Sequence, residues 1–210
     1  MEKLNFRTGN PFVLYARYGF FGFLRLAIDT MVTKFNFSRA RIIRRPFYIR
    51  GQENIDLGNN FTAGVGLRID AFSPDGKKVL RIGDNVEVND YVHIGAICSV
   101  KLGNNVLIAS KVFISDHNHG TYSGDQQSSP DEPPSERELS FNPVEIEDNV
   151  WVGENVAILP GVRIGRGAII GANSVITRSV PAETIFAGNP ARKIKVFERA
   201  SGKWVSAKEV

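Results

Sequence analysis

An aliphatic residue recurs at every sixth position over long stretches of this chain, and this period is the strongest constraint on its fold. An amphipathic helix has a period near 3.6 and a half-exposed strand a period of about 2, so neither produces a step of six. The longest run has no miss, and three shorter sets keep the same step. The members are Ile146, Val152, Ile158, Ile164, Ile170 and Ile176, then Ile82, Val88 and Ile94, then Leu102, Ile108 and Ile114, and a weaker set of Leu57, Ala63 and Ile69.

A coil of three short strands explains this step. Three hexads make one turn, each aliphatic side chain points inward from one of three flat sheets, and successive coils stack at ~4.8 Å. Corners between such strands favour residues that tolerate positive φ, as in Gly83-Asp84-Asn85 and Asp148-Asn149. A β-sandwich, with turn signals every ~8 to 12 residues, is the alternative, but the sixfold step keeps its phase too long for it. The sequence therefore predicts an all-β protein, a parallel β-helix of roughly five coils.

The period divides the chain into three parts. Residues 1–45 form an N-terminal helical and basic segment, residues 46–197 the β-helix domain, and residues 198–210 a C-terminal tail. The hexads stop within residues 115–143, which are rich in Ser, Pro, Glu and Asp and which we expect to form one long inserted loop. Open sheet edges at both ends of a β-helix require caps, which the N-terminal helix and the segment after Pro181 can supply.

Composition limits the compartment and the partners. One cysteine cannot form an internal disulfide, and the N-terminus lacks the order of a secretory signal. No run reaches the ~18 to 20 apolar residues of a spanning helix, so we expect a cytoplasmic protein. The N-terminal helix mixes aromatic residues with arginines, and it either caps the β-helix or contacts an anionic membrane at its inner face. We expect no nucleic-acid partner and no metal.

The inserted loop opens with two of the three histidines in the chain, in Ser115-Asp116-His117-Asn118-His119-Gly120. Long excursions from a regular solenoid are often functional. An imidazole has an unperturbed pKa near neutrality and suits general-base chemistry. His117 and His119 are therefore the candidate catalytic residues.

The hexad arrays, the loop with Asn118-His119, and the segment 187–192 (Ala-Gly-Asn-Pro-Ala-Arg) resemble the hexapeptide-repeat O-acetyltransferases. The likeness is greatest to sugar acetyltransferases of lipopolysaccharide O-antigen and capsule biosynthesis and to galactoside acetyltransferase. This resemblance implies a left-handed β-helix and a homotrimer with active sites between subunits. It also implies that acetyl-CoA is the acyl donor, that a sugar hydroxyl is the acceptor, and that no covalent acyl-enzyme forms.

The resemblance also assigns roles to single residues. It places His119 at the catalytic base, with His117 as the competitor. If His117 is not the base, then it, Asp116 or a backbone carbonyl can orient the catalytic ring. The implied acetyl-CoA contacts are Trp151, Ala172, Thr177, Arg178, Arg192 and Lys195.

For the acceptor we consider polar residues near the loop. Asn89 and Asp90 interrupt the apolar array and can bind sugar hydroxyls, although they can equally be corner residues. Asp70 and Asp116 are further candidates for the same role. Tyr122 can stack on a sugar face or can be a plain loop aromatic.

Three classes of function stay open at this point. The first is acetyl transfer to a sugar hydroxyl, with N-acetylation of an amino sugar as its variant. The second is a γ-type carbonic anhydrase that uses His93, His117 and His119 as zinc ligands, although the His-x-His spacing argues against it. The third is a catalytically silent β-helix scaffold, because fold does not imply function.

Overall fold

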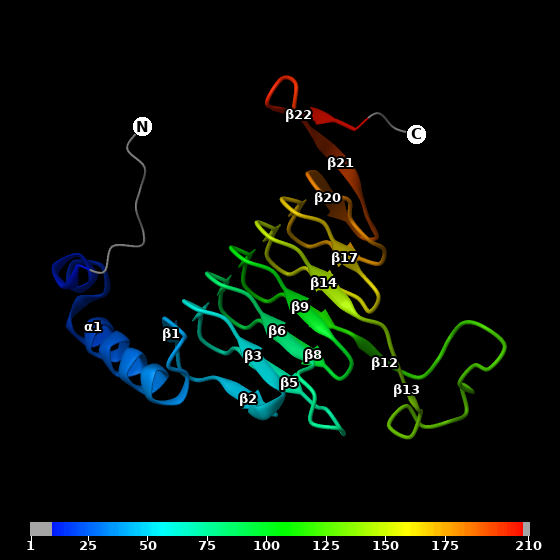
Figure 1. Cartoon of the computed structure of the whole chain (residues 1–210), viewed down its shortest axis with the longest axis horizontal. Coiled ribbons are helices and arrows are strands. Elements are labelled where there is room, and N and C mark those ends of the chain that lie inside the picture. The colour runs from blue at the N-terminus through cyan, green and yellow to red at the C-terminus, as the bar shows by residue number, and fades with distance from the viewer. Residues whose placement is uncertain (1–9, 208–210) are drawn as a thin grey trace.

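The computed structural model describes residues 10–207, and these residues form a parallel β-helix with three sheets (Figure 1). Residues 1–9 of the predicted N-terminal segment and residues 208–210 of the predicted tail lie outside the described residues.

Sheet A contains β1 (Ile42–Ile43), β4 (Thr62–Ala63), β7 (Glu87–Val88), β10 (Leu107–Ile108), β15 (Trp151–Val152), β18 (Ile169–Ile170), β20 (Thr184–Gly188), β21 (Ala191–Glu198) and β22 (Lys203–Ser206). Sheet B contains β2 (Tyr48–Arg50), β5 (Arg68–Ala71), β8 (His93–Ala96), β11 (Phe113–Ser115), β16 (Ala157–Ile158) and β19 (Val175–Ile176). Sheet C contains β3 (Ile55–Leu57), β6 (Leu80–Ile82), β9 (Val100–Leu102), β14 (Val144–Ile146) and β17 (Arg163–Ile164), and a 3₁₀ turn at Gln52–Asn54 precedes β3.

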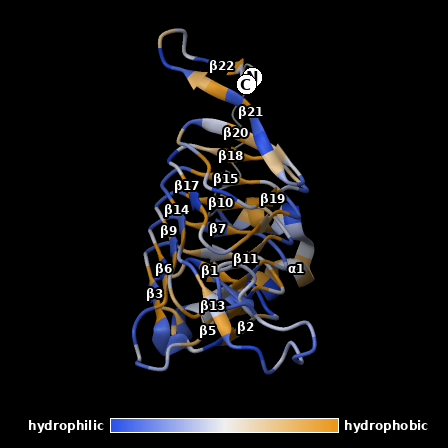
Figure 2. Ribbon diagram, turned by 90° about the vertical axis from the view of Figure 1, so that its right-hand side faces the viewer, coloured by the Kyte–Doolittle hydropathy of each residue, from blue (hydrophilic) through white to orange (hydrophobic). Residues whose placement is uncertain are grey.

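The sixfold period is confirmed as the inward-facing core. Ile114 pairs in register with Ile94 on one side and Ile158 on the other, and all three side chains are buried. In Figure 2 the strands of successive coils lie one above another, which gives the stack its layered appearance. Full burial of one such side chain stabilises the fold by about 1.5–3 kcal/mol. The core is therefore a column of aliphatic layers, and the outward side chains are left free for function.

Each coil contributes one strand to sheet B, and this sheet has six strands, so the described chain has six coils. The sequence predicted roughly five. The first coil comprises β1 to β3, and its first strand begins at Ile42, four residues before the predicted start of the domain. Ile43, Ile49 and Ile55 in this coil keep the sixfold step, so the period could have revealed it.

Asparagines turn the corner between sheets C and A, as the sequence predicted. Asn85, Asn105 and Asn149 have φ between 56° and 59°, in the left-handed region that asparagine tolerates. The Asn85 amide Nδ2 donates to Asn105 Oδ1 at 3.2 Å, so the corners of neighbouring coils are also joined by side chains. The corners therefore help to fix the register between coils.

Helix α1 (Pro11–Asn36) lies beside the first coil, at the end opposite β20–β22 (Figure 1). Asn10 caps its start by accepting a hydrogen bond from Phe12 N at 3.0 Å, and Gly19 bends it with φ 66°. The helix buries Asp29 and Thr33 and leaves most of its aromatic residues exposed. Thr33 Oγ1 accepts from Ile43 N at 2.8 Å, and Asp29 Oδ1 accepts from Arg45 Nε at 2.6 Å. Polar contacts to β1 and to the segment just after it therefore help to dock α1.

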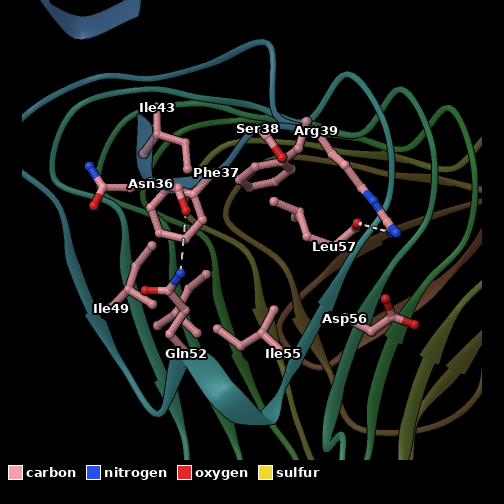
Figure 3. A pocket seen from close by; sticks show the side chains of 12 residues that line it. Asn36, Phe37, Ser38, Arg39, Ile43, Ile49, Gln52, Ile55, Asp56 and Leu57 are labelled. Atoms are coloured by element: carbon pink, nitrogen blue, oxygen red, sulfur yellow. Dashed lines mark hydrogen bonds between the residues drawn. The ribbon is translucent and has the colours of Figure 1, made fainter. Parts of the chain in front are cut away.

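The N-terminal end of the lumen is closed by aromatic residues next to α1. Phe37 and Phe47 pack with ring centroids 6.1 Å apart. A hollow of about 270 Å³ is left between Phe37 and the aliphatic side chains of the first coil, such as Ile43 and Ile49 (Figure 3). No helix within residues 10–207 is long and apolar enough to cross a membrane.

The predicted loop leaves the β-helix at the corner between sheets B and C. Its base is a two-stranded antiparallel ribbon of β12 (His117–His119) and β13 (Leu139–Phe141), and its outer part projects from the body of the molecule (Figure 1). At the other end of the chain, β20, β21 and β22 pair antiparallel and prolong sheet A. Part of the predicted tail is therefore ordered as strand β22.

Candidate active site

The outward face of sheet B carries a row of polar side chains that ends at the inserted loop. The register aligns Arg50, Asp70, Gly95 and Ser115 on four successive coils. A second row, two residues away along each strand, aligns Tyr48, Arg68, His93 and Phe113. These rows and the loop histidines enclose a pocket of about 370 Å³, called the histidine pocket below. It is lined by Arg50, Arg68, Asp70, Phe72, His93, Gly95, Phe113, Ser115, His117 and His119.

His117 is held by a buried carboxylate. Its Nδ1 lies 2.9 Å from Asp116 Oδ1, and Asp116 has no solvent-exposed surface. Asp116 Oδ2 accepts hydrogen bonds from Cys98 N at 2.8 Å and Ser99 N at 2.7 Å, and both of its oxygens lie 3.1 Å from Ile97 N. A carboxylate can only accept hydrogen bonds, so the Nδ1 atom of His117 carries a proton and donates it in the hydrogen bond to Asp116. The Nε2 atom of His117 then carries the lone pair.

Two neighbours fix the position of the His117 ring. Ser115 Oγ lies 3.3 Å from Nδ1 and donates to the His117 carbonyl at 2.9 Å. On the preceding coil, a Cβ atom at Gly95 would lie 3.1 Å from His117 Cε1. The glycine is therefore needed for the close approach of the ring to sheet B, a role that the sequence analysis did not identify.

His119 also lines the histidine pocket but is anchored differently. Its side chain is exposed, and within residues 10–207 its ring makes no hydrogen bond. The Tyr122 hydroxyl donates to the His119 backbone carbonyl, and Arg137 Nη1 donates to that hydroxyl at 2.9 Å. Tyr122 thus supports the loop backbone. Of the two loop histidines, only His117 has a carboxylate partner in the described chain.

Asp70 is the centre of a charged cluster in the same pocket. Its carboxylate accepts from Arg50 Nε at 2.6 Å and Arg68 Nε at 2.8 Å, and lies 3.2 Å from His93 Nε2. The hydrogen bond from Arg50 is the largest cause that lowers the pKa of Asp70 to about 2, with Arg68 adding to it. Burial lowers the pKa of His93 below its ordinary value, and the arginines oppose its protonation. The cluster therefore holds two cations and one anion.

The structure separates the predicted acceptor residues. Asp70 lies in the histidine pocket, but Asn89 and Asp90 lie at the corner between sheets A and B and do not line it. Asp90 Oδ1 accepts from Val65 N at 2.8 Å, which is the corner role weighed as the alternative. Asp116 cannot contact an acceptor as predicted, because its carboxylate is fully buried and filled by backbone donors and His117. It occupies the alternative position of a residue that orients a histidine.

The residues predicted to contact acetyl-CoA lie on the later coils and do not line the histidine pocket. Trp151 lies on β15 in sheet A with half of its surface exposed. Thr177 and Arg178 are exposed at the corner after β19, and Ala172 is exposed at the corner after β18. Arg192 and Lys195 are exposed on β21. Exposed cations suit the phosphates of coenzyme A, but a single chain does not gather these residues with His117.

Sequence reasoning missed Arg50, Arg68 and Gly95 as site residues. Arg50 stands twenty residues before Asp70 and pairs with it on the next coil. A search for polar residues at equivalent outward positions of successive coils would have found the two arginines. Within residues 10–207, no group of three or more His, Cys, Asp and Glu side chains is arranged to hold a metal ion.

The comparisons with known proteins agree with this architecture. The family described as bacterial transferase hexapeptide (six repeats) matches residues 143–178. Escherichia coli K12 WbbJ, whose name assigns it provisionally to O-acetyl transfer in lipopolysaccharide biosynthesis, is 50% identical over 195 residues, which cover 92% of this chain and 98% of WbbJ. Galactoside O-acetyltransferase of the same organism is 32% identical over 153 residues, covering 73% of this chain and 59% of that enzyme.

A solved structure extends the likeness to a bound acyl donor. The hexapeptide-repeat acetyltransferase VCA0836 of Vibrio cholerae O1 biovar eltor, complexed with acetyl coenzyme A, is 28% identical with a TM-score of 0.50, over 69% of this chain and 68% of that chain. These neighbours imply the left-handed winding that the resemblance predicted. On the extent of the match to WbbJ and on its own sixfold repeat, the chain belongs to the hexapeptide-repeat transferase family.

Proposed function

We propose that this protein is an acetyl-CoA-dependent O-acetyltransferase that acts on a sugar hydroxyl in the biosynthesis of a surface polysaccharide, an O-antigen or a capsule. The names of WbbJ and galactoside O-acetyltransferase, and the acetyl coenzyme A in VCA0836, support this activity. The observation that carries the proposal is the pairing of His117 with buried Asp116 in a pocket on the outward face of sheet B.

His117 is the general base in this proposal, and this reverses the order of the two histidines predicted from sequence. Asp116 holds the Nδ1 proton of His117, so Nε2 can accept the proton of an acceptor hydroxyl. His119 lacks such a partner within the described residues, and we assign it to acceptor contact at the pocket rim.

The reaction then needs no covalent enzyme intermediate. The hydroxyl oxygen attacks the thioester carbonyl carbon, and His117 takes the hydroxyl proton as the new C–O bond forms. The tetrahedral oxyanion requires N–H donors, which a backbone amide can supply. As the carbonyl reforms, the C–S bond breaks, and the proton on His117 passes to the departing thiolate, giving the ester and free coenzyme A.

In this proposal a neighbouring subunit completes the acetyl-CoA site, and the active enzyme is the homotrimer that the family resemblance implies. Arg178, Arg192 and Lys195 are exposed and can hold phosphates, while Trp151 can border the cofactor. Ala172 and Thr177 would contribute backbone contacts. Because these residues lie apart from His117 on one chain, a second copy must bring them to the histidine pocket.

Helix α1 supports a location at the inner face of a membrane. Ten of its large apolar side chains are exposed, and Arg39, Arg41 and Arg44 follow it in the chain. Aromatic and aliphatic side chains beside a basic stretch bind the interface of an anionic bilayer without crossing it. The exposed set is Phe12, Val13, Tyr15, Tyr18, Phe20, Phe21, Leu24, Ile28, Met31 and Phe35.

A thiol-release assay tests the proposed function. Purified protein and acetyl-CoA are incubated with a panel of free sugars, glycosides, nucleotide sugars and amino sugars, and the ester or amide product is identified by mass spectrometry. Acceptor-dependent thiol release with an O-acetylated sugar is the expected result. Transfer only to amino groups would favour N-acetylation. If none of the acceptors in the panel supports thiol release, the proposal is contradicted.

A further inference from the structure

The charge of the Asp70 cluster is unbalanced. Asp70 is ionised throughout the physiological range, because its pKa is about 2, and it is bonded by two guanidinium groups. One arginine suffices to neutralise one carboxylate. His93 does not offset the second arginine, since it can add only positive charge. The cluster therefore keeps an excess of one cation inside the histidine pocket.

Both arginines still have donors to offer. Each bonds Asp70 through Nε, and within residues 10–207 neither makes a hydrogen bond through its terminal nitrogens. The side chains of Arg50 and Arg68 are 57% and 50% exposed. The Arg50 guanidinium also lies over the Phe72 ring, 5.3 Å from its centroid, which helps to hold its plane. Fixed guanidinium groups with free N–H donors are suited to a phosphate or carboxylate.

The same two arginines line a second pocket. This pocket, of about 960 Å³, continues along sheet B toward the first coil and contains Tyr48 and Tyr91. The two tyrosines are 64% and 61% exposed, and the Tyr91 ring lies against Gly66, where an added Cβ would be 2.4 Å from its Cδ1. We call it the tyrosine pocket. Arg50 and Arg68 are thus the shared wall between it and the histidine pocket.

From the position of the two arginines between the two pockets, we propose that Arg50 and Arg68 form a subsite for the phosphate of a glycosyl phosphate acceptor. The proposal rests on the function proposed above and narrows its substrate class. The sugar lies at His117, its phosphate at the two arginines, and the substituent beyond the phosphate over Tyr48 and Tyr91. A carboxylate belonging to the sugar itself would leave the tyrosine pocket without an occupant, so a substituted phosphate is the better match. The substituent is either a nucleoside or a lipid.

Paired acceptors test this subsite. For glucose, galactose and N-acetylglucosamine, kcat/KM for thiol release is measured with the methyl glycoside, the uridine diphosphate sugar and the dodecyl diphosphate sugar. The wild-type enzyme should prefer a phosphorylated form by about tenfold or more, as expected when a charged hydrogen-bonded contact is gained. The better of the two diphosphates identifies the nucleoside or the lipid. Equal kcat/KM for glycoside and diphosphate would overturn the proposal.

Variants connect the preference to the arginines. Arg68→Gln and Arg50→Gln should each reduce the preference for the phosphorylated form by about tenfold and leave the KM for acetyl-CoA unchanged. Arg81→Gln removes an equal charge from sheet C and should leave the preference intact. Circular dichroism verifies that each variant is folded. A preference that survives in both Arg50→Gln and Arg68→Gln would refute the subsite.

A binding measurement separates this proposal from the proposed function. Calorimetric titration with the same diphosphate sugars needs no turnover. Binding that is lost in Arg68→Gln but kept in Arg81→Gln supports the subsite even if no acetyl transfer is detected. Transfer to neutral glycosides, without binding of any diphosphate sugar, would overturn the subsite and leave the acetyltransferase standing.

Discussion

The decisive contact at the scale of single residues is the hydrogen bond between Asp116 and His117. Asp116 accepts three backbone N–H groups from the segment 97–99, so it is both a structural anchor of one corner and the orienting partner of the ring. The same buried carboxylate thus stabilises the corner between sheets B and C and orients the histidine of the pocket.

Asp116→Asn should damage activity more than folding. The amide can no longer accept at both positions, so the His117 ring loses the partner that fixes its tautomer. We expect kcat to fall by about 10²- to 10⁴-fold, as for loss of general-base function, and the free energy of unfolding to fall by roughly 1–3 kcal/mol. Thiol-release kinetics and urea unfolding measure the two effects. A variant with normal kcat would show that His117 needs no orienting carboxylate.

Asp70→Asn should show a pH-dependent loss of stability. The folded-state pKa of Asp70 is lowered from 3.8 to about 2, so its ionised form stabilises the fold fully above pH ~4. This contribution disappears as the pH falls through 2. We expect the variant to be less stable than the wild type by about 1–2 kcal/mol at pH 7, and the difference to shrink at pH 2.5. Urea unfolding at both pH values measures it, and a difference that grows on acidification contradicts the pKa.

At the scale of elements, the sequence predicts the strands well and the surface contacts poorly. Each inward residue of the hexads obeys one local rule, that it stacks on its equivalent one coil, or three short strands, away, so the inward positions of Ile94, Ile114 and Ile158 could be recognised from the repeat. Which outward residues meet depends on the register between coils, which also depends on the length of each corner. Arg50, Asp70 and Gly95 are therefore visible as one row only in the structure.

The order of the loop histidines shows the same limit. Both stand in one short segment, and the sequence does not reveal where β12, a strand of the two-stranded ribbon, points its side chains. The contact of His117 with Asp116 depends on the turn at 97–99 of the preceding coil, nearly twenty residues earlier in the chain. A local motif cannot report such a contact. Helix α1, in contrast, lies within the N-terminal segment, residues 1–45, for which the sequence predicts a helix, because helical propensity is local.

Helix α1 should bind anionic vesicles through its exposed aromatic residues. We expect the triple replacement Phe12→Ser, Phe21→Ser and Phe35→Ser to abolish flotation with anionic vesicles, because these side chains are 85%, 83% and 90% exposed. Neutral vesicles serve as the control for the role of the arginines. Light scattering measures the mass of the triple variant in solution. If the oligomer changes while flotation is unaffected, a neighbouring subunit and not a membrane covers the helix.

At the level of the whole molecule, the proposed active site requires residues from more than one chain. Mixing two inactive variants tests this requirement. His117→Ala lacks the base and Arg178→Ala weakens the acetyl-CoA contact, so a mixed trimer has some sites in which both residues are intact. Co-refolded or co-expressed mixtures should recover a substantial fraction of wild-type thiol release, and each variant alone should not. No recovery in a mixed trimer whose composition is verified by native mass spectrometry would place both residues in one subunit's site.

Paired histidine variants decide which of the two loop rings is the general base. His117→Ala and His119→Ala are compared by acceptor-dependent thiol release, with trimer mass and thermal unfolding as controls for folding. We expect His117→Ala to lower kcat by about 10²- to 10⁴-fold, and His119→Ala to act mainly on the KM of the acceptor. The reverse pattern, a large loss of kcat in His119→Ala and near-normal turnover in His117→Ala, would contradict this expectation.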